Sequence, residues 1–121
     1  MGSDESGVVE RYLACLAVND WDGLAATIAD DDLIRDGPYC DVVEGKQPYL
    51  KFLQGVFASL QGYRLDVQRI SHTGDRVCYV ELSETFDIDG APSECSECLV
   101  VEKNSVGLIN RVSVFIKQLA T

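Results

Sequence analysis

Basic residues are scarce in this chain. Lys and Arg together number 10 against 20 Asp and Glu, which gives a formal net charge of −10. Nucleic-acid binding depends on clustered Lys and Arg that contact phosphates, and docking on anionic lipid depends on the same cations. We therefore expect neither nucleic acid nor a membrane surface among the partners.

Long apolar runs are also missing. No stretch approaches the roughly 18 residues that cross a bilayer. The start of the chain, Met1-Gly2-Ser3-Asp4-Glu5, is polar and acidic, unlike a secretory signal peptide. The odd number of cysteines, 5, then indicates free thiols in a reducing compartment. These features predict a soluble, cytoplasmic protein.

The sequence has no motif for a metal or a nucleotide. It contains one His, and Cys95 and Cys98 would point to opposite faces of a strand. That arrangement does not favour zinc, which prefers four converging Cys or His ligands. A glycine-rich phosphate loop is absent as well. We expect no metal and no cofactor.

The first half of the chain shows helical spacing. Its 121 residues fit one domain, 1–121, that can bury a real core. Apolar residues at helical intervals predict a helix over 4–18, a short second helix with Trp21 facing inward, and a third near 46–60. We expect Gly62 to cap the third helix. Leu33 to Asp36 is interpreted as a short strand before the Gly37-Pro38 turn.

From Tyr63 onward the apolar period changes to two, which is typical of strands. Turn residues separate four such segments, and Asp89-Gly90-Ala91-Pro92 is a hairpin signal. Helices first and a four-strand meander last predict an α+β fold. We expect a cone-shaped, curved antiparallel or mixed sheet that encloses one pocket with the three helices.

Several segments resemble the nuclear transport factor 2-like superfamily. They are Val8-Val9-Glu10-Arg11-Tyr12-Leu13-Ala14, Asn19-Asp20-Trp21-Asp22-Gly23-Leu24, Ala29-Asp30-Asp31 and Glu44-Gly45. That superfamily includes the polyketide-cyclase-like (SnoaL-like) proteins and the steroid Δ5-3-ketoisomerases. The resemblance covers most of the chain and is more specific for the fold than for the reaction, because this scaffold carries many functions.

The resemblance to the isomerases implies three catalytic residues. Asp36 corresponds to the family's base, and Tyr12 with Glu97 to its oxyanion donors. Two departures are visible: the family's Asp-Pro is Asp36-Gly37 here, and a supporting tyrosine of the third helix corresponds to Leu53. From the residues alone, Asp36 could instead initiate a turn and Tyr12 could simply pack in the core.

Glu84 interrupts an otherwise apolar strand face. That face runs Cys78, Val80, Leu82, Glu84, Phe86, Ile88, and the next strand offers Cys95, Glu97, Leu99 and Val101. A two-residue Gly90-Ala91 loop would set Glu84 directly opposite Glu97, whereas a four-residue loop would make them diagonal neighbours. Either arrangement disfavours joint ionisation, so one carboxyl should stay protonated. The alternative is that one Glu reaches solvent at the sheet rim.

These expectations define a pocket and its candidate functions. The pocket would be lined by Tyr12, Trp21, Phe57, Leu82, Glu84, Phe86, Glu97 and Leu99 and would take an apolar small molecule. The leading hypothesis is an isomerase or related proton-transfer enzyme acting on an apolar carbonyl compound. The alternatives are a non-catalytic ligand-binding or dimerising module, or an epoxide hydrolase or polyketide cyclase relative, although no arginine shows a convincing hydrolase motif.

The superfamily resemblance also implies a homodimer that pairs through the sheet. The face expected toward solvent carries Tyr79, Val100, Val112 and Val114 among polar neighbours. That face is more apolar than a fully hydrated surface, although scattered surface hydrophobes are common.

Overall fold

The computed structural model describes residues 3–117. The helices are α1 (Ser3–Val18), α2 (Trp21–Ala25) and α3 (Lys46–Ala58). The strands are β1 (Ile34–Asp36), β2 (Val42–Glu44), β3 (Gln61–Thr73), β4 (Val77–Ile88), β5 (Ala91–Lys103) and β6 (Ile109–Ile116). None of the helices in the described range is long and apolar enough to cross a membrane. The predicted α+β fold is confirmed.

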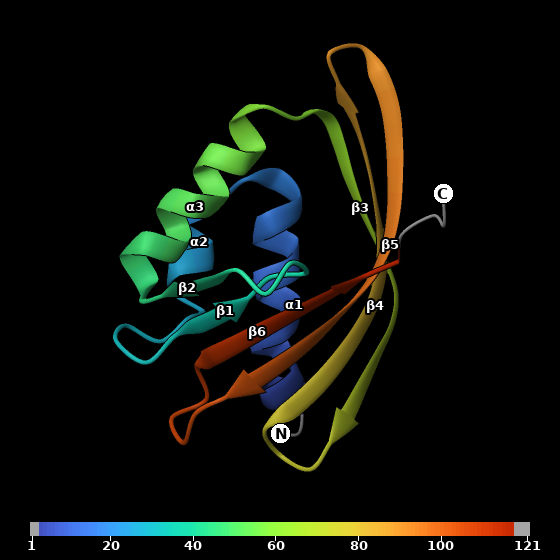
Figure 1. Cartoon of the computed structure of the whole chain (residues 1–121). Coiled ribbons are helices and arrows are strands. Elements are labelled where there is room, and N and C mark those ends of the chain that lie inside the picture. The colour runs from blue at the N-terminus through green and yellow to red at the C-terminus, as the bar shows by residue number, and fades with distance from the viewer. Residues whose placement is uncertain (1–2, 118–121) are drawn as a thin grey trace.

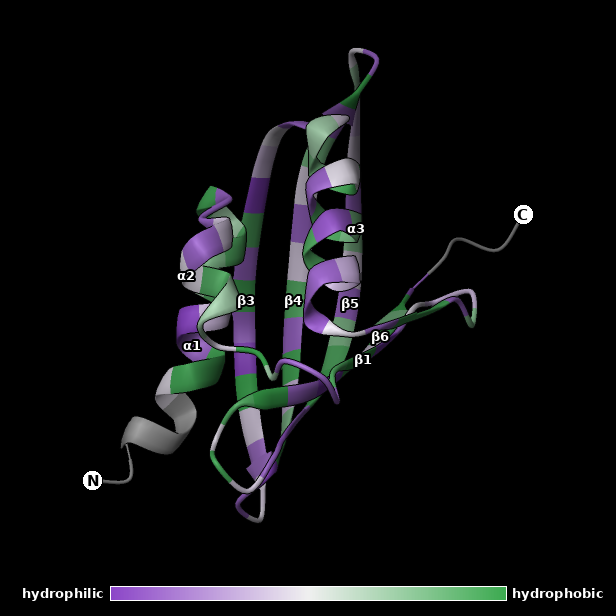
Figure 2. Cartoon of the chain, turned by 90° about the vertical axis from the view of Figure 1, so that its left-hand side faces the viewer, coloured by the Kyte–Doolittle hydropathy of each residue, from purple (hydrophilic) through white to green (hydrophobic). Residues whose placement is uncertain are grey.

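The six strands form one mixed sheet in the order β2-β1-β6-β5-β4-β3. All neighbours are antiparallel except β1 and β6, which run parallel. β3, β4 and β5 bend around the helices, and all three helices lie on the concave side (Figure 1). Seen from that side, α1 and α3 stand in front of the sheet with β4 visible between them (Figure 2). The concave face therefore looks onto the helices.

Helix α1 uses its predicted apolar stripe to cover the sheet. Val8, Val9, Tyr12, Leu13 and Leu16 are all buried. The end of α3 differs from the prediction, because the helix stops at Ala58 and Ser59 is its C-cap. Gly62 instead lies in β3 with φ 62°, next to a register shift between Gln61 and Arg64. Glycine accepts that positive φ without a Cβ clash, so it serves the bulge rather than the helix end.

The β4–β5 hairpin turns at Asp89-Gly90, where φ is 53° and 81°. Positive φ at both positions is the requirement of a two-residue type I′ turn, and Asp-Gly is a favoured sequence for it. The turn pairs Ile88 with Ala91 and hence Glu84 with Cys95. The predicted Gly90-Ala91 loop is therefore wrong by one residue. Glu84 and Glu97 are diagonal neighbours on the concave face.

The convex, outer face of the sheet differs in part from the prediction. Tyr79 and Val100 lie opposite each other on β4 and β5, and Tyr79 is exposed as expected. Val112 and Val114 were expected outside, but Val112 is buried and both line the cavity described below. Phe115 lies on the outer face instead. Both alternating sets of positions on β6 contain apolar residues. Alternation alone therefore left the orientation of β6 open.

Candidate functional site

A cavity of about 520 Å³ lies between the concave face of the sheet and helices α1 and α3. We call it the central cavity. Its size falls within the range of about 300–1,000 Å³ that is usual for small-molecule sites. Most of its wall is apolar, with side chains such as Leu53, Phe57, Phe86, Leu99, Val112 and Ile116. A few polar groups interrupt that wall, which is the pattern of a ligand site.

Six of the predicted pocket residues line the central cavity. They are Tyr12, Phe57, Glu84, Phe86, Glu97 and Leu99. Trp21 and Leu82 do not. Trp21 packs edge-on against the Phe57 ring at 5.5 Å and supports it from outside, while Leu82 is 1% exposed in the core. The structure therefore brings six of the eight residues together at the cavity surface and places Trp21 and Leu82 behind it.

Asp36 lies outside the central cavity. Its carboxylate accepts hydrogen bonds from Arg111 and, at 3.2 Å, from the Ser113 hydroxyl. These partners belong to β6, which pairs in parallel with β1. Successive strand residues point to opposite faces, and it is Arg35 that faces the cavity. The expectation that Asp36 and Tyr12 share one cavity is therefore wrong.

Glu84 and Glu97 do meet inside the cavity, and we call them the carboxyl pair. Their carboxylate oxygens and the Cys95 sulfur all lie within 4.8 Å of one another. The predicted proximity of the two acids is confirmed. Burial, followed by the hydrogen bond to Glu84 and the negative charge of Glu84, raises the pKa of Glu97 to about 9. Glu97 therefore holds a proton at neutral pH and can donate it.

Two further groups hold the carboxyl pair in place. Tyr63 donates its hydroxyl hydrogen bond to Glu84, and its ring packs edge-on against Phe57 at 4.6 Å. The Cys95 thiol lies 3.6 Å from Glu97 and 3.9 Å from Glu84. Burial, followed by the charges of Glu97 and Glu84, raises the pKa of Cys95 to about 12. The thiol thus stays protonated and acts as a hydrogen-bond donor, not as a nucleophile.

Tyr12 and Tyr49 form a hydroxyl pair deep in the cavity wall. Their oxygens share a hydrogen bond between α1 and α3, and the residues are only 1% and 2% exposed. Burial raises the pKa of Tyr12 well above its ordinary value and that of Tyr49 to about 12. Both hydroxyls are therefore neutral donors. Since one donates to the other, the pair retains one O–H group for a further partner.

Arg35 is the basic residue of the cavity wall. Its guanidinium stacks 4.5 Å from the centre of the Phe52 ring and forms a 2.6 Å ion pair with Asp41. Arg111, by contrast, contacts two acids, Asp36 and Glu102, on the outer face. An arginine between two acids, as an epoxide hydrolase would need, therefore exists on this chain but lies away from the cavity.

Sequence reasoning missed Tyr49 and Arg35. Tyr49 hydrogen-bonds to Tyr12, the role that the family correspondence gave to the position of Leu53. Tyr49 lies four residues, or one helical turn, before Leu53. Both residues line the cavity, so the i, i+4 spacing on α3 was the available signal. For Arg35 the signal was its place next to Asp36 on the strand. Neighbouring strand residues point to opposite faces, so only one of the two can face the cavity.

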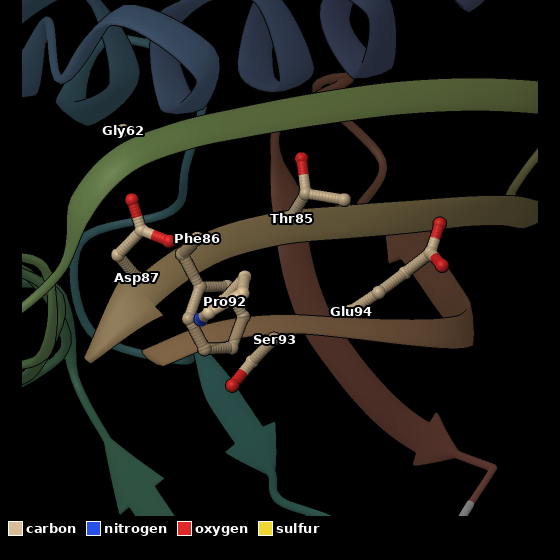
Figure 3. Close-up of a pocket in the computed structure, with 7 residues that line it drawn as sticks. All are labelled: Gly62, Thr85, Phe86, Asp87, Pro92, Ser93 and Glu94. Atoms are coloured by element: carbon tan, nitrogen blue, oxygen red, sulfur yellow. The ribbon is translucent and has the colours of Figure 1, made fainter. Parts of the chain in front are cut away.

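A second hollow lies at the outer end of the β4–β5 hairpin (Figure 3). It has a volume of about 350 Å³ and is lined by Gly62, Thr85, Phe86, Asp87, Pro92, Ser93 and Glu94. Its acids, Asp87 and Glu94, lie well apart on either side of Phe86 (Figure 3). Because no polar groups converge there, the central cavity is the candidate site.

The sheet order, the helices on its concave face and the cavity between them are those of a nuclear transport factor 2-like domain. The model of the SnoaL-like domain matches residues 9–112. The chain therefore belongs to the SnoaL-like domain family. A search of curated proteins finds no match.

Solved structures agree on the fold. A SnoaL-like polyketide cyclase from Shewanella denitrificans has a TM-score of 0.83 at 10% identity, covering 93% of this chain and 90% of that one. A protein described as a ketosteroid isomerase from Kribbella flavida has a TM-score of 0.76 at 20% identity, covering 97% of this chain and 80% of that one. RV0760c from Mycobacterium tuberculosis, in complex with estradiol-17beta-hemisuccinate, has a TM-score of 0.77 at 19% identity, covering 89% of this chain and 89% of that one. At these identities the similarity shows the fold alone.

Proposed function

We propose that this protein binds an apolar carbonyl compound in the central cavity and moves a proton on the carbon next to the carbonyl group. The observation that carries the proposal is the carboxyl pair, in which a protonated Glu97 and Glu84 lie together in an apolar wall. One such pair offers both an acid and a base.

Glu97 and the tyrosine pair act on the oxygen of the carbonyl compound. The one O–H of Glu97, which donates to Glu84 in the free protein, donates to that oxygen instead when the ligand binds, and the remaining O–H of the Tyr12–Tyr49 pair is a second donor. Both are neutral donors in a largely apolar cavity, so they stabilise negative charge as it develops on the oxygen. These two donors thereby hold the oxygen of the enolate.

Glu84 replaces Asp36 as the proposed base. Its carboxylate takes a proton from the carbon next to the carbonyl and can return it at the same carbon or at a conjugated one. Return at the conjugated carbon is isomerisation, and return at the same carbon is exchange. The Tyr63 hydroxyl donates a hydrogen bond to Glu84 and orients its carboxylate.

The comparisons support the proposed class of ligand and reaction. One structural neighbour is described as a ketosteroid isomerase, and another is in complex with a steroid ester. The family's SnoaL-like fold is also that of a polyketide cyclase. These relatives are consistent with an apolar carbonyl ligand for the cavity.

Hydrogen–deuterium exchange tests the proposal without the natural substrate. Steroid and terpenoid ketones are incubated with the protein in D₂O, and loss of the proton signal next to the carbonyl is followed by NMR. We expect Glu84→Gln to slow exchange at least about 100-fold. Glu81→Gln is the matched control, since Glu81 lies on the same strand but pairs with Arg69. Equal rates for Glu84→Gln and the wild type would contradict the assignment.

A non-catalytic ligand-binding module is the second candidate. It is favoured by one observation, the position of Asp36 outside the cavity in an ion pair with Arg111. Saturable ketone binding with no exchange above the buffer rate, across the whole panel, would support this alternative over the enzyme.

A further inference from the structure

We infer that Arg35 recognises a carboxylate on the ligand, so that the central cavity takes an apolar carbonyl compound bearing an acid group. This inference rests on the proposed function and narrows its substrate class from neutral ketones to oxo acids. It depends on where Arg35 lies, how few partners it has and what surrounds it.

The backbone fixes Arg35 firmly at the cavity wall. β1 is an inner strand, and Arg35 is paired with Val43 of β2 on one side and Val112 of β6 on the other. The guanidinium then lies over the Phe52 ring of α3. Such stacking restricts the plane of the guanidinium and leaves its N–H edge available to a partner.

Asp41 neutralises the Arg35 charge but uses only part of its hydrogen-bonding capacity. Its side chain is 12% exposed, whereas its partner Asp41 is 46% exposed. Within the described residues, the guanidinium makes one hydrogen bond, from Nη1 to Asp41. A guanidinium carries five N–H donors, and a largely buried cation is stabilised only when its donors are matched. A ligand carboxylate that binds the fork with two hydrogen bonds would supply that match.

The surroundings make this position selective. Among the described residues 3–117, Arg35 is the one basic residue that lines the central cavity, in a chain with a net charge of −10. An anionic ligand therefore has a single favourable position there. The positive charge also lowers the pKa of Glu97 in opposition to burial, so it acts within range of the carboxyl pair. One ligand can thus place a carbonyl at Glu97 and a carboxylate at Arg35.

Matched phenols separate the two ends of the site. A phenol resembles the enol of a ketone and reports on Glu97, so the probes are 4-hydroxyphenylalkanoic acids with one to three methylenes and their methyl esters. Affinities are measured by isothermal titration calorimetry at pH 7. We expect the best acid to bind at least about tenfold more tightly than its ester, as a charged hydrogen-bonded pair provides. In Arg35→Gln the acid should bind no better than the ester.

Two further variants secure the interpretation. Arg111→Gln makes the same substitution on the outer face and should keep the preference for the acid. Asp41→Asn removes the competing carboxylate and should tighten acid binding without changing ester binding, which gives a test even if Arg35→Gln fails to fold. Circular dichroism establishes folding for each variant.

The outcomes distinguish the inference from the function beneath it. Ester binding that Glu97→Gln weakens, with no preference for the acid in the wild type, would overturn the role of Arg35 and leave the carbonyl site standing. An acid preference that survives in folded Arg35→Gln would also overturn that role. Absence of binding by every acid and ester would overturn both proposals.

Discussion

Tyr63 on β3 donates its hydroxyl hydrogen bond to Glu84 on the neighbouring strand β4. The bond holds the Glu84 carboxylate beside Glu97 in the carboxyl pair. Burial, followed by the hydrogen bond to Glu84 and the charge of Glu84, raises the pKa of Glu97 to about 9. The two acids therefore divide their roles, since Glu97 holds a proton at neutral pH while Glu84 accepts a hydrogen bond from Tyr63. The first two predictions test that division.

Replacement of Glu84 should change how Glu97 titrates. Glu84→Gln removes the negative neighbour, so the pKa of Glu97 should fall below about 9. It should still stay above the ordinary value, because burial is the largest cause of its elevation. Carbon-detected NMR of the Glu side chains follows both groups. The control Glu81→Gln should leave the Glu97 titration unchanged, and a wild-type Glu97 that titrates near 4.3, about the value of a solvated Glu, would refute the shared site.

The raised pKa of Glu97 also predicts how stability depends on pH. Between the usual value of 4.5 and about 9, the folded protein retains a proton that the unfolded chain has lost. Its contribution is fully present below pH 4.5 and is lost as pH rises through that window, with a slope of at most about 1.4 kcal/mol per pH unit. Glu97→Gln removes this dependence.

Urea denaturation of both proteins at several pH values measures the effect. The stability of the Glu97→Gln variant relative to the wild type should rise from pH 5 to pH 9. Their other titrating groups are shared, so the difference reports on Glu97 together with its coupling to Glu84. A difference that does not vary with pH would show that Glu97 ionises alike in the folded and unfolded chains.

The tyrosine pair should show strong coupling. Tyr12 and Tyr49 share a buried hydrogen bond, so either single replacement by Phe leaves the other hydroxyl without this partner. Each should lower the free energy of unfolding by about 1–3 kcal/mol. The double variant should lose clearly less than the sum, because both polar groups are then gone. Additive losses in a double-mutant cycle would mean that the two hydroxyls have separate partners.

Much of the fold followed from periodicity. The stripe from Val8 to Leu16 and the alternation from Cys78 to Ile88 each pointed at one buried face, so helices, meander and cavity wall were predictable. The three-residue strand β2 was not, because Val42–Glu44 is too short for a period to be visible. Its position depends on pairing with β1, a tertiary contact.

The candidate site was harder to predict than the fold. Glu84 and Glu97 were found because a charged residue on an apolar face is conspicuous. Asp36 was misplaced because the family correspondence gives a position along the chain, whereas the cavity is reached by every second strand residue. One residue of register separates Asp36 from Arg35, and that step exchanges an acid for a base in the cavity wall. Local sequence does not resolve such a step at a short strand.

The last prediction concerns the outer face of the sheet. Phe115 on β6 is 60% exposed and Tyr79 on β4 is 39% exposed. Large apolar side chains on an open sheet face are a feature of protein interfaces, and we expect two copies of the chain to pair there. Phe115→Lys should then weaken the dimer at least about tenfold, since truncating an interface aromatic commonly costs more than 1 kcal/mol. Val106→Lys is the matched control, because Val106 is 76% exposed in the turn before β6 and lies off this face. Sedimentation velocity across a concentration series measures the dimer. A wild type that stays monomeric at about 50 μM, where interfaces of standard size are populated, would contradict the prediction.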